Sequence, residues 1–137
     1  MDTMTPDERS LMMSRIRSKD TKPERMVRSL LHQMGFRFRI HVKTLPGTPD
    51  IVLPRYRTVI FVHGCFWHRH EGCKFAYNPK DRADFWQAKF RQNVNNDKRA
   101  LEKLCELGWR SIVVWECETT DQGLPQRLSA ELREAHT

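Results

Sequence analysis

The sequence contains no long apolar run. Hydrophobic residues make up 39% of its 137 residues, and no stretch approaches the roughly 20 consecutive apolar residues that span a bilayer. The N-terminal sequence MDTMTPDERS also lacks the apolar core of a secretory signal. These absences argue against a membrane protein and predict a globular chain that stays in the cytoplasm.

Acidic residues are scarce over most of the chain. Two of the 24 Lys and Arg but five of the 17 Asp and Glu lie in residues 116–137, which leaves 22 basic against 12 acidic residues, a net charge of +10, in residues 1–115. Such a surplus favours a polyanionic partner such as nucleic acid. It also serves solubility, so charge alone leaves both interpretations open.

Cysteine is limited to four residues, and a reducing cytoplasm argues against reading them as two disulfides. Cys65, His70 and Cys73 lie close together, and Cys117 follows the last apolar run. Tetrahedral zinc takes four Cys or His ligands, so this set favours a structural Zn²⁺ site. The alternative is four reduced cysteines without metal. Cys105 falls in the apolar pattern of a predicted helix and is assigned to the core.

Local signals predict alternating helices and strands. Thr5-Pro6-Asp7-Glu8 and Thr21-Lys22-Pro23-Glu24 are typical of helix starts, the second helix ending at Gly35. The further predicted elements are a strand over 36–42 with one basic face, a hairpin of 51–53 and 58–62, a helix from Arg82 to Leu107, a strand over 111–115 and a helix around 125–135. This order predicts one α/β domain with a central mixed sheet flanked by helices.

Residues 63–81 show no periodicity and are rich in His, Cys, Phe and Trp. Long loops of this kind are usually functional or disordered, and the aromatic content disfavours disorder. Two of its histidines, His63 and His68, are candidate bases near neutral pH, although a lone histidine is more often structural. Asp50 enters the first hairpin strand, where nucleases hold Mg²⁺. The alternative is a turn-capping aspartate.

The predicted long helix places Lys89, Asn93 and Asp97 on one face. Asp97 can orient a catalytic histidine there, or it can be a solvated charge. We expect Lys89 and Asn93 to contact DNA from this face.

Apolar wedges that enter between base steps unstack DNA at a cost of about a few kcal/mol per step, and less at a mismatch. Phe66 and Trp67 in the loop, Trp86 on the helix and Met13 near the N-terminus are candidates for such a wedge. Core packing is the ordinary interpretation of each one. Phe66 and Trp67 are harder to bury because they lie between predicted metal ligands.

Six segments form a more specific pattern. They are LPGTPD at 45–50, VIFVHGCFWH at 59–68, Phe85-Trp86, Asn93-Val94 with Asp97, LGWR at 107–110 and VWEC at 114–117. Together they resemble the very-short-patch-repair (Vsr) family of DNA mismatch endonucleases, from about Met13 to Cys117. The resemblance implies a restriction-endonuclease-like fold with a structural Zn²⁺ and a catalytic Mg²⁺.

The resemblance also implies an enzyme that nicks duplex DNA 5′ to the mispaired thymine of a T:G mismatch, the lesion left when 5-methylcytosine deaminates. Its implied partners are DNA, a MutL-type mismatch-repair protein and, functionally, a DNA cytosine methyltransferase. We expect a nucleoid-associated monomer. Residues 1–137 are expected to form a single domain, with 1–19 as a DNA-contacting arm and 118–137 as an acidic tail.

Individual roles follow from the same resemblance. It makes Asp50 and the backbone carbonyl of Val62 ligands of Mg²⁺, with Glu24 as an accessory acid. The implied catalytic histidine is His68, supported by Asp97, and His63 is a second active-site histidine. The implied zinc ligands are Cys65, His70, Cys73 and Cys117. The implied DNA-contacting residues are Phe66, Trp67, Trp86 and Met13.

The sequence departs from this pattern in three places. The second hairpin strand lacks the Glu-x-Lys pair of restriction-like enzymes, the Cys65–Cys73 spacing is one residue longer than expected, and the histidine run is reduced to His-Arg-His-Glu. Two rival functions therefore remain at this stage. One is a less selective restriction-type nickase on the same scaffold, and the other is a zinc-stabilised DNA-binding module without catalysis.

Overall fold

The protein is described here from a computed structural model, which covers residues 21–136 and the side chains of residues 21–134. The helix predicted to start at Thr5, the arm of residues 1–19 and the wedge candidate Met13 lie outside the described residues. No helix within the described range has the length and apolar character to cross a membrane.

The centre is a three-stranded mixed sheet in the order β1-β2-β3. Strands β1 (Ile51–Leu53) and β2 (Thr58–His63) are antiparallel, joined by the short 3₁₀ helix η1 (Pro54–Tyr56). Strand β3 (Arg110–Trp115) lies parallel to β2, with Val62 opposite Val114. A parallel pair needs a long crossover, which helix α3 (Ala83–Glu106) supplies. The predicted hairpin, third strand and long helix are confirmed.

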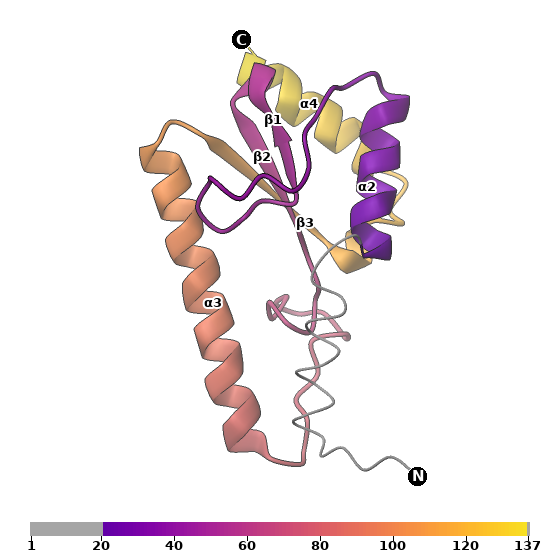
Figure 1. Ribbon diagram of the computed structural model, residues 1–137. Helices are drawn as coiled ribbons and strands as arrows, with labels where there is room; N and C mark the ends of the chain where they lie inside the picture. The colour runs from indigo at the N-terminus through magenta and orange to yellow at the C-terminus, as the bar shows by residue number, and fades with distance from the viewer. Residues whose placement is uncertain (1–20, 137) are drawn as a thin grey trace.

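Helices cover both faces of the sheet (Figure 1). Helices α2 (Lys22–Gln33) and α4 (Leu124–His136) pack on one face, and α3 packs on the other. Alternate strand residues point to opposite faces, so two separate clusters form. The first cluster joins the apolar residues of α2 and α4 to Ile51, Leu53, Ile60, Val62, Ile112 and Val114. The second joins Leu104 of α3 to Val52, Val59 and Phe61.

The start of α2 follows its sequence signal only in part. Thr21 Oγ1 accepts a hydrogen bond from the backbone N–H of Glu24 at 3.3 Å, as an N-cap does. The helix ends at Gln33, and Gly35, just after the C-cap Met34, adopts a φ of +85°, as expected of a glycine that follows a helix. The Glu24 side chain, however, is 5% exposed and accepts a hydrogen bond from Arg28 at 3.2 Å. Glu24, in the first turn of the helix, therefore places a buried carboxylate in the interior.

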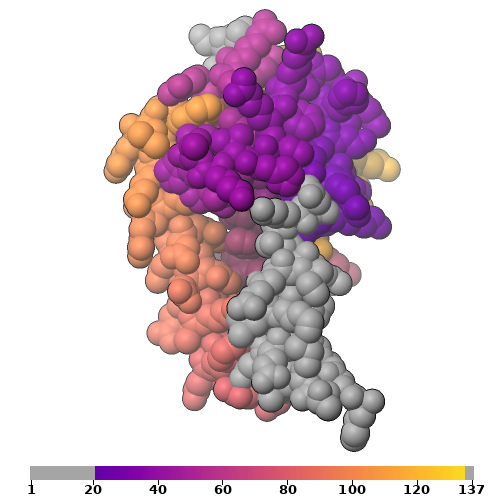
Figure 2. Space-filling model, in the orientation of Figure 1, coloured from indigo at the N-terminus to yellow at the C-terminus, as the bar shows by residue number. Residues whose placement is uncertain are grey.

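The predicted strand over residues 36–42 is wrong. Only Arg39 pairs with the sheet, through an isolated bridge to Val52, and His41 has a φ of +59° that ends any extended run. Phe36 and Phe38 pack against the first core cluster, whereas Val42 packs against the second. The alternation arises because the chain wraps around the β1 edge and crosses from one face to the other. Figure 2 shows this segment covering the upper part of the visible face.

Gly47, in the turn before β1, packs closely against Ala100 of α3. Its φ is +75°, and a Cβ there would lie 2.6 Å from Cβ of Ala100 and 3.3 Å from the ring of Phe61. Only glycine allows this close approach, and the chain then enters β1 through Asp50.

Cys105, assigned to the core from its sequence pattern, is exposed. It follows the inward-facing Leu104 by one residue, about 100° around the helix.

Candidate active site and metal centre

Four side chains from distant segments converge at the end of the sheet. Cys65, His70 and Cys73 come from the irregular loop after β2, and Cys117 comes from the 3₁₀ helix η2 (Glu116–Glu118) after β3. Their ligand atoms all lie within 4.8 Å of one another, so the group can hold a metal ion. Cys105 is not part of it.

The spacing within this cluster fits tetrahedral coordination. The His70 Nδ1 atom lies 3.6 Å from Cys65 Sγ and 3.4 Å from Cys117 Sγ. Metal–ligand bonds of about 2.3 Å to sulfur and 2.0 Å to nitrogen place neighbouring ligands roughly 3.5 Å apart in a tetrahedron. Burial raises the pKa of Cys65 to about 12, so a bound cation is needed to hold this sulfur as a thiolate at neutral pH.

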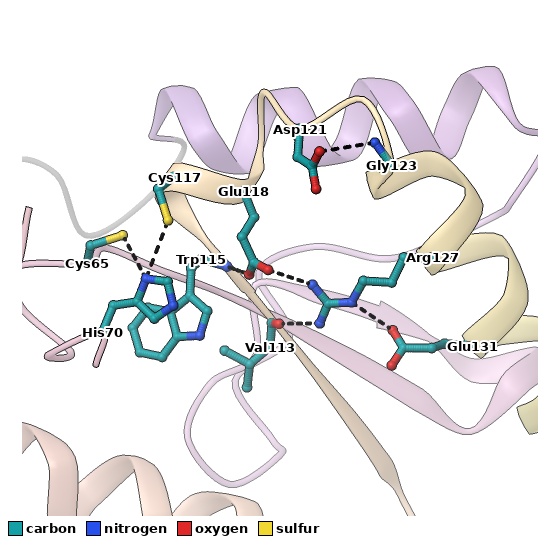
Figure 3. A network of polar contacts seen from close by, with 10 residues as sticks. All are labelled: Cys65, His70, Val113, Trp115, Cys117, Glu118, Asp121, Gly123, Arg127 and Glu131. Carbon is teal, nitrogen blue, oxygen red and sulfur yellow. Dashed lines mark hydrogen bonds and ion pairs between the residues drawn. The ribbon is translucent and has the colours of Figure 1, made fainter. Parts of the chain in front are cut away.

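A network of hydrogen bonds around Glu118 holds the turn that carries Cys117 (Figure 3). Glu118 accepts a hydrogen bond from the Trp115 amide at 2.8 Å and another from Arg127 of α4 at 3.1 Å. Arg127 also donates to the carbonyl of Val113 at 2.9 Å. The Trp115 ring stacks on His70, with centroids 4.3 Å apart and planes 9° apart. The end of β3, the start of η2 and α4 thus support two of the four ligands.

A second centre lies between the end of β2 and α3. The Nδ1 atom of His68 is 2.6 Å from a carboxylate oxygen of Asp97. Asp97 is therefore a paired residue and not a solvated charge. A neutral His68 that donates from Nδ1 keeps Nε2 as the nitrogen that can accept a proton. The pair has the base–orienter arrangement of many hydrolases.

His63, the last residue of β2, lies directly against this pair. Its ring stacks on that of His68, with centroids 4.0 Å apart. Burial, followed by the charge of His68, lowers the pKa of His63 to about 4, so His63 is neutral at neutral pH. Its Nδ1 atom is buried and has no hydrogen-bond partner among the described residues. A neutral ring in this place adds no competing positive charge beside His68.

A half-buried carboxylate, Asp50, meets the buried carboxylate of Glu24 at the start of β1. Asp50 Oδ2 accepts a hydrogen bond from the Val62 amide at 2.6 Å, which joins β1 to the end of β2. Burial raises the pKa of Asp50 to about 7, the Val62 amide lowers it, and the nearby Glu24 carboxylate raises it further. A like-charged buried pair is unfavourable without a cation. Oxygen donors of this kind suit a hard divalent ion.

The predicted aromatic residues form one cluster against α3. The Phe66 ring lies 5.1 Å from Trp67 and 5.5 Å from Trp86, centroid to centroid. Trp86 is 8% exposed, whereas Phe66 and Trp67 are half-buried. Asn93 donates to the Trp67 carbonyl at 3.1 Å, and Lys89 Nζ lies 5.9 Å from the Trp67 ring. The predicted shared face of Lys89, Asn93 and Asp97 therefore carries both the aromatic contacts and the His68 contact.

Sequence reasoning missed several residues that build this region. Phe90 and Tyr77 complete the aromatic cluster, with ring centroids 5.2 and 4.9 Å from that of Phe66. Phe90 had a signal, because it lies four residues after Trp86 on the same helical face. Tyr77 and the Glu118–Arg127 pair had none, because their partners are distant in sequence.

Comparison with known proteins shows the family to which the chain belongs. A family model described as DNA mismatch endonuclease Vsr matches residues 1–74. The type II nicking enzyme V.XorIIP of Xanthomonas oryzae pv. oryzae is 52% identical over 132 residues, which cover 96% of this chain and 94% of that protein. The DNA mismatch endonuclease Vsr of Escherichia coli is 44% identical over 126 residues, which cover 88% of this chain and 80% of that protein. The chain belongs to the Vsr family of DNA mismatch endonucleases.

A solved structure confirms the predicted fold class of this Vsr-family chain. The catalytic domain of the homing endonuclease I-Bth0305I matches it with a TM-score of 0.62, covering 86% of this chain and all of that domain at 23% identity. The restriction-endonuclease-like α/β fold is therefore shared. Membership of the Vsr family makes the protein an endonuclease that acts on DNA.

The assignment of Cys117 as a metal ligand, and of Cys105 as a residue outside the cluster, can be tested with two matched variants. Cys117→Ser removes one of four converging ligands, so we expect the purified variant to lose most of its bound metal and to unfold at a lower temperature. Cys105→Ser changes an exposed side chain outside the cluster and should keep its metal. Elemental analysis and thermal unfolding of both variants test this. Equal, full metal content in the two would show that Cys117 is not a ligand.

Proposed function

We propose that this Vsr-family protein nicks duplex DNA 5′ to the mispaired thymine of a T:G mismatch and so starts the repair of deaminated 5-methylcytosine. The observation that carries the proposal is the juxtaposition of the His68–Asp97 pair with the half-buried Asp50 and buried Glu24 carboxylates. A proton-accepting histidine beside an oxygen-rich cation site is suited to metal-assisted hydrolysis of a phosphodiester.

Asp50 and Glu24, with the backbone carbonyl of Val62, are the residues proposed to hold Mg²⁺. When bound, Mg²⁺ supplies positive charge to phosphate oxygens and lowers the pKa of coordinated water. The Val62 amide holds one Asp50 oxygen at 2.6 Å, which fixes the orientation of this carboxylate. Arg28 donates to Glu24 at 3.2 Å and restrains the second carboxylate in the same way.

His68 is proposed to take the proton from the attacking water at Nε2. Asp97 fixes the ring through Nδ1 and stabilises the protonated form that results. His63 stacks on the same ring and limits its rotation. Because His63 is neutral near pH 7, it does not oppose protonation of His68.

The four-ligand cluster is proposed to hold Zn²⁺ in a structural role. Three thiolates and one imidazole are a usual zinc donor set, and four protein ligands leave no open position for substrate. The ligands Cys65, His70 and Cys73 flank the segment that carries Phe66, Trp67 and His68. With Zn²⁺ bound, these ligands would position His68 without offering the ion to the substrate.

The aromatic cluster is proposed to open the duplex beside the lesion. Phe66 and Trp67 would enter between base steps, which is least costly next to a mismatch. Trp86 is 8% exposed and would join them by turning out of its packing against Phe66. Lys89 and Asn93 flank the cluster on α3 and would contact the DNA, and Met13 is proposed to approach from the other groove. We further propose that the protein acts as a monomer in the cytoplasm, on the nucleoid, downstream of a cytosine methyltransferase and together with a MutL-type protein.

A second candidate is a nickase with little preference for mismatches, because the 52%-identical relative is a type II nicking enzyme by name. Matched duplexes of one sequence, with T:G, T:A or C:G at a single position, separate the two functions. We expect purified protein with Mg²⁺ to nick only the T:G duplex, on the thymine strand. Equal cutting of all three would instead establish the unselective nickase.

Asp50→Ala should abolish nicking and leave binding of the T:G duplex near that of wild type, because it removes the proposed cation ligand from the start of β1. Nicking rates and band-shift assays measure the two effects. Asp81→Ala, which removes an exposed aspartate from the loop, is the matched control and should retain activity. Full Mg²⁺-dependent cleavage by Asp50→Ala would remove this residue from the site.

His68→Ala should slow cleavage about a hundred-fold or more, the usual contribution of a general base. Asp97→Asn should reduce the rate in the same direction, because the ring loses its charged partner. Single-turnover rates on the T:G duplex provide the measurement, with the exposed His32→Ala of α2 as control. A loss of only a few-fold in His68→Ala would make His68 a structural residue.

A further inference from the structure

Arg69 donates hydrogen bonds to four acceptors within the irregular loop between β2 and α3, which is called the aromatic loop below. Its Nη1 atom donates to the carbonyls of Phe66 and Tyr77 at 3.3 and 3.0 Å. Its Nη2 atom donates to the carbonyl of Ala76 and to the side-chain oxygen of Asn78, both at 2.9 Å. One guanidinium thus joins the beginning of the loop to a segment seven to nine residues downstream.

The same guanidinium also lies on α3. Its Cζ atom is 4.0 Å from the centroid of the Phe90 ring and 5.9 Å from that of Phe66. Among the described residues no carboxylate pairs with it, so its charge is met by carbonyl oxygens and aromatic faces. Arg69 itself has a φ of +57°, an uncommon backbone conformation for a non-glycine residue that the surrounding contacts must hold.

These contacts restrain the aromatic loop on the side that the metal cluster does not reach. Cys65, His70 and Cys73 hold the loop toward η2 and β3. Arg69 holds it toward α3, and Gln87 of α3 shares the Asn78 oxygen at 3.3 Å. The planar fork of arginine suits several acceptors in fixed directions, which a lysine cannot reproduce.

We propose that Arg69 is a positioning residue for mismatch recognition, holding the Phe66–Trp67 segment in the conformation that enters the DNA. This inference rests on the proposed function of the aromatic cluster as a wedge. A wedge ordered before binding avoids the entropy cost of ordering it on the DNA. Arg69 therefore contributes to affinity for the mismatch and not to the hydrolytic step.

The test compares Arg69→Ala with Lys74→Ala, which removes the same charge from an exposed position in the same loop. Binding is measured with Ca²⁺ in place of Mg²⁺, using T:G and T:A duplexes that carry 2-aminopurine beside the variable pair, because its fluorescence rises on unstacking. Arg69→Ala should bind the T:G duplex about tenfold more weakly, the effect of one substantial interface residue. It should also lose the fluorescence rise and keep its affinity for the T:A duplex.

Two milder variants keep the test informative if Arg69→Ala folds poorly. Arg69→Lys retains the charge without the fork and should keep most of the defect. Asn78→Ala removes one acceptor and should produce a smaller change in the same direction. With Mg²⁺, each variant should raise KM for the T:G duplex and change kcat at saturating DNA by less than about threefold, because the His68–Asp97 pair is untouched.

Three results would overturn the proposal. Equal weakening of binding to the T:G and T:A duplexes would identify a simple phosphate contact. Loss of metal from Arg69→Lys would identify a role in folding the metal loop. Binding by Arg69→Ala that matches Lys74→Ala would show that Arg69 has no role. Absence of any T:G preference or fluorescence rise in wild-type protein would instead refute the proposed function itself. Wild-type preference with an unaffected Arg69→Ala variant would refute only the role of Arg69.

Discussion

The convergence of Cys65, His70, Cys73 and Cys117 is the constraint on which the rest of the site depends. The loop between β2 and α3 has no helix or strand of its own, so few backbone hydrogen bonds define its path. Three possible metal ligands within nine residues, which lie against a fourth in η2 after β3, restrict this path instead. The residues enclosed by the ligands then reach α3, where Asp97 and the aromatic cluster lie.

The two faces of the sheet contribute unequally. The α2–α4 face is mainly apolar core and sends one charged group, Glu24, toward the active site. The α3 face supplies Asp97, Asn93 and the aromatic platform. Glu24 beside Asp50 forms a like-charged pair, which is relieved when a cation binds or when one carboxyl takes up a proton. Each face of the sheet thus carries both apolar core and side chains of the site.

Sequence and structure disagree where a local pattern had two explanations. Alternation over residues 36–42 is equally typical of a strand and of a chain that crosses a sheet edge, and the left-handed conformation of His41 decides for the second. Cys105 follows the inward-facing Leu104 too closely to share its side of the helix. Two neighbouring apolar residues of a helix point about 100° apart, so the apolar character of Cys105 does not show which way its side chain faces.

Strong local signals were sufficient to predict the Thr21 cap, the Gly35 stop, the hairpin and the long helix. The sequence also predicted which four residues come together as a possible metal site, because closely spaced thiol and imidazole side chains are usual ligands of a tetrahedral ion. Only the tertiary structure shows that Arg127 supports Cys117 through Glu118 and that Arg69 holds the loop between β2 and α3 against α3. These contacts join residues through side-chain directions and packing, which leave no periodic signal along the chain.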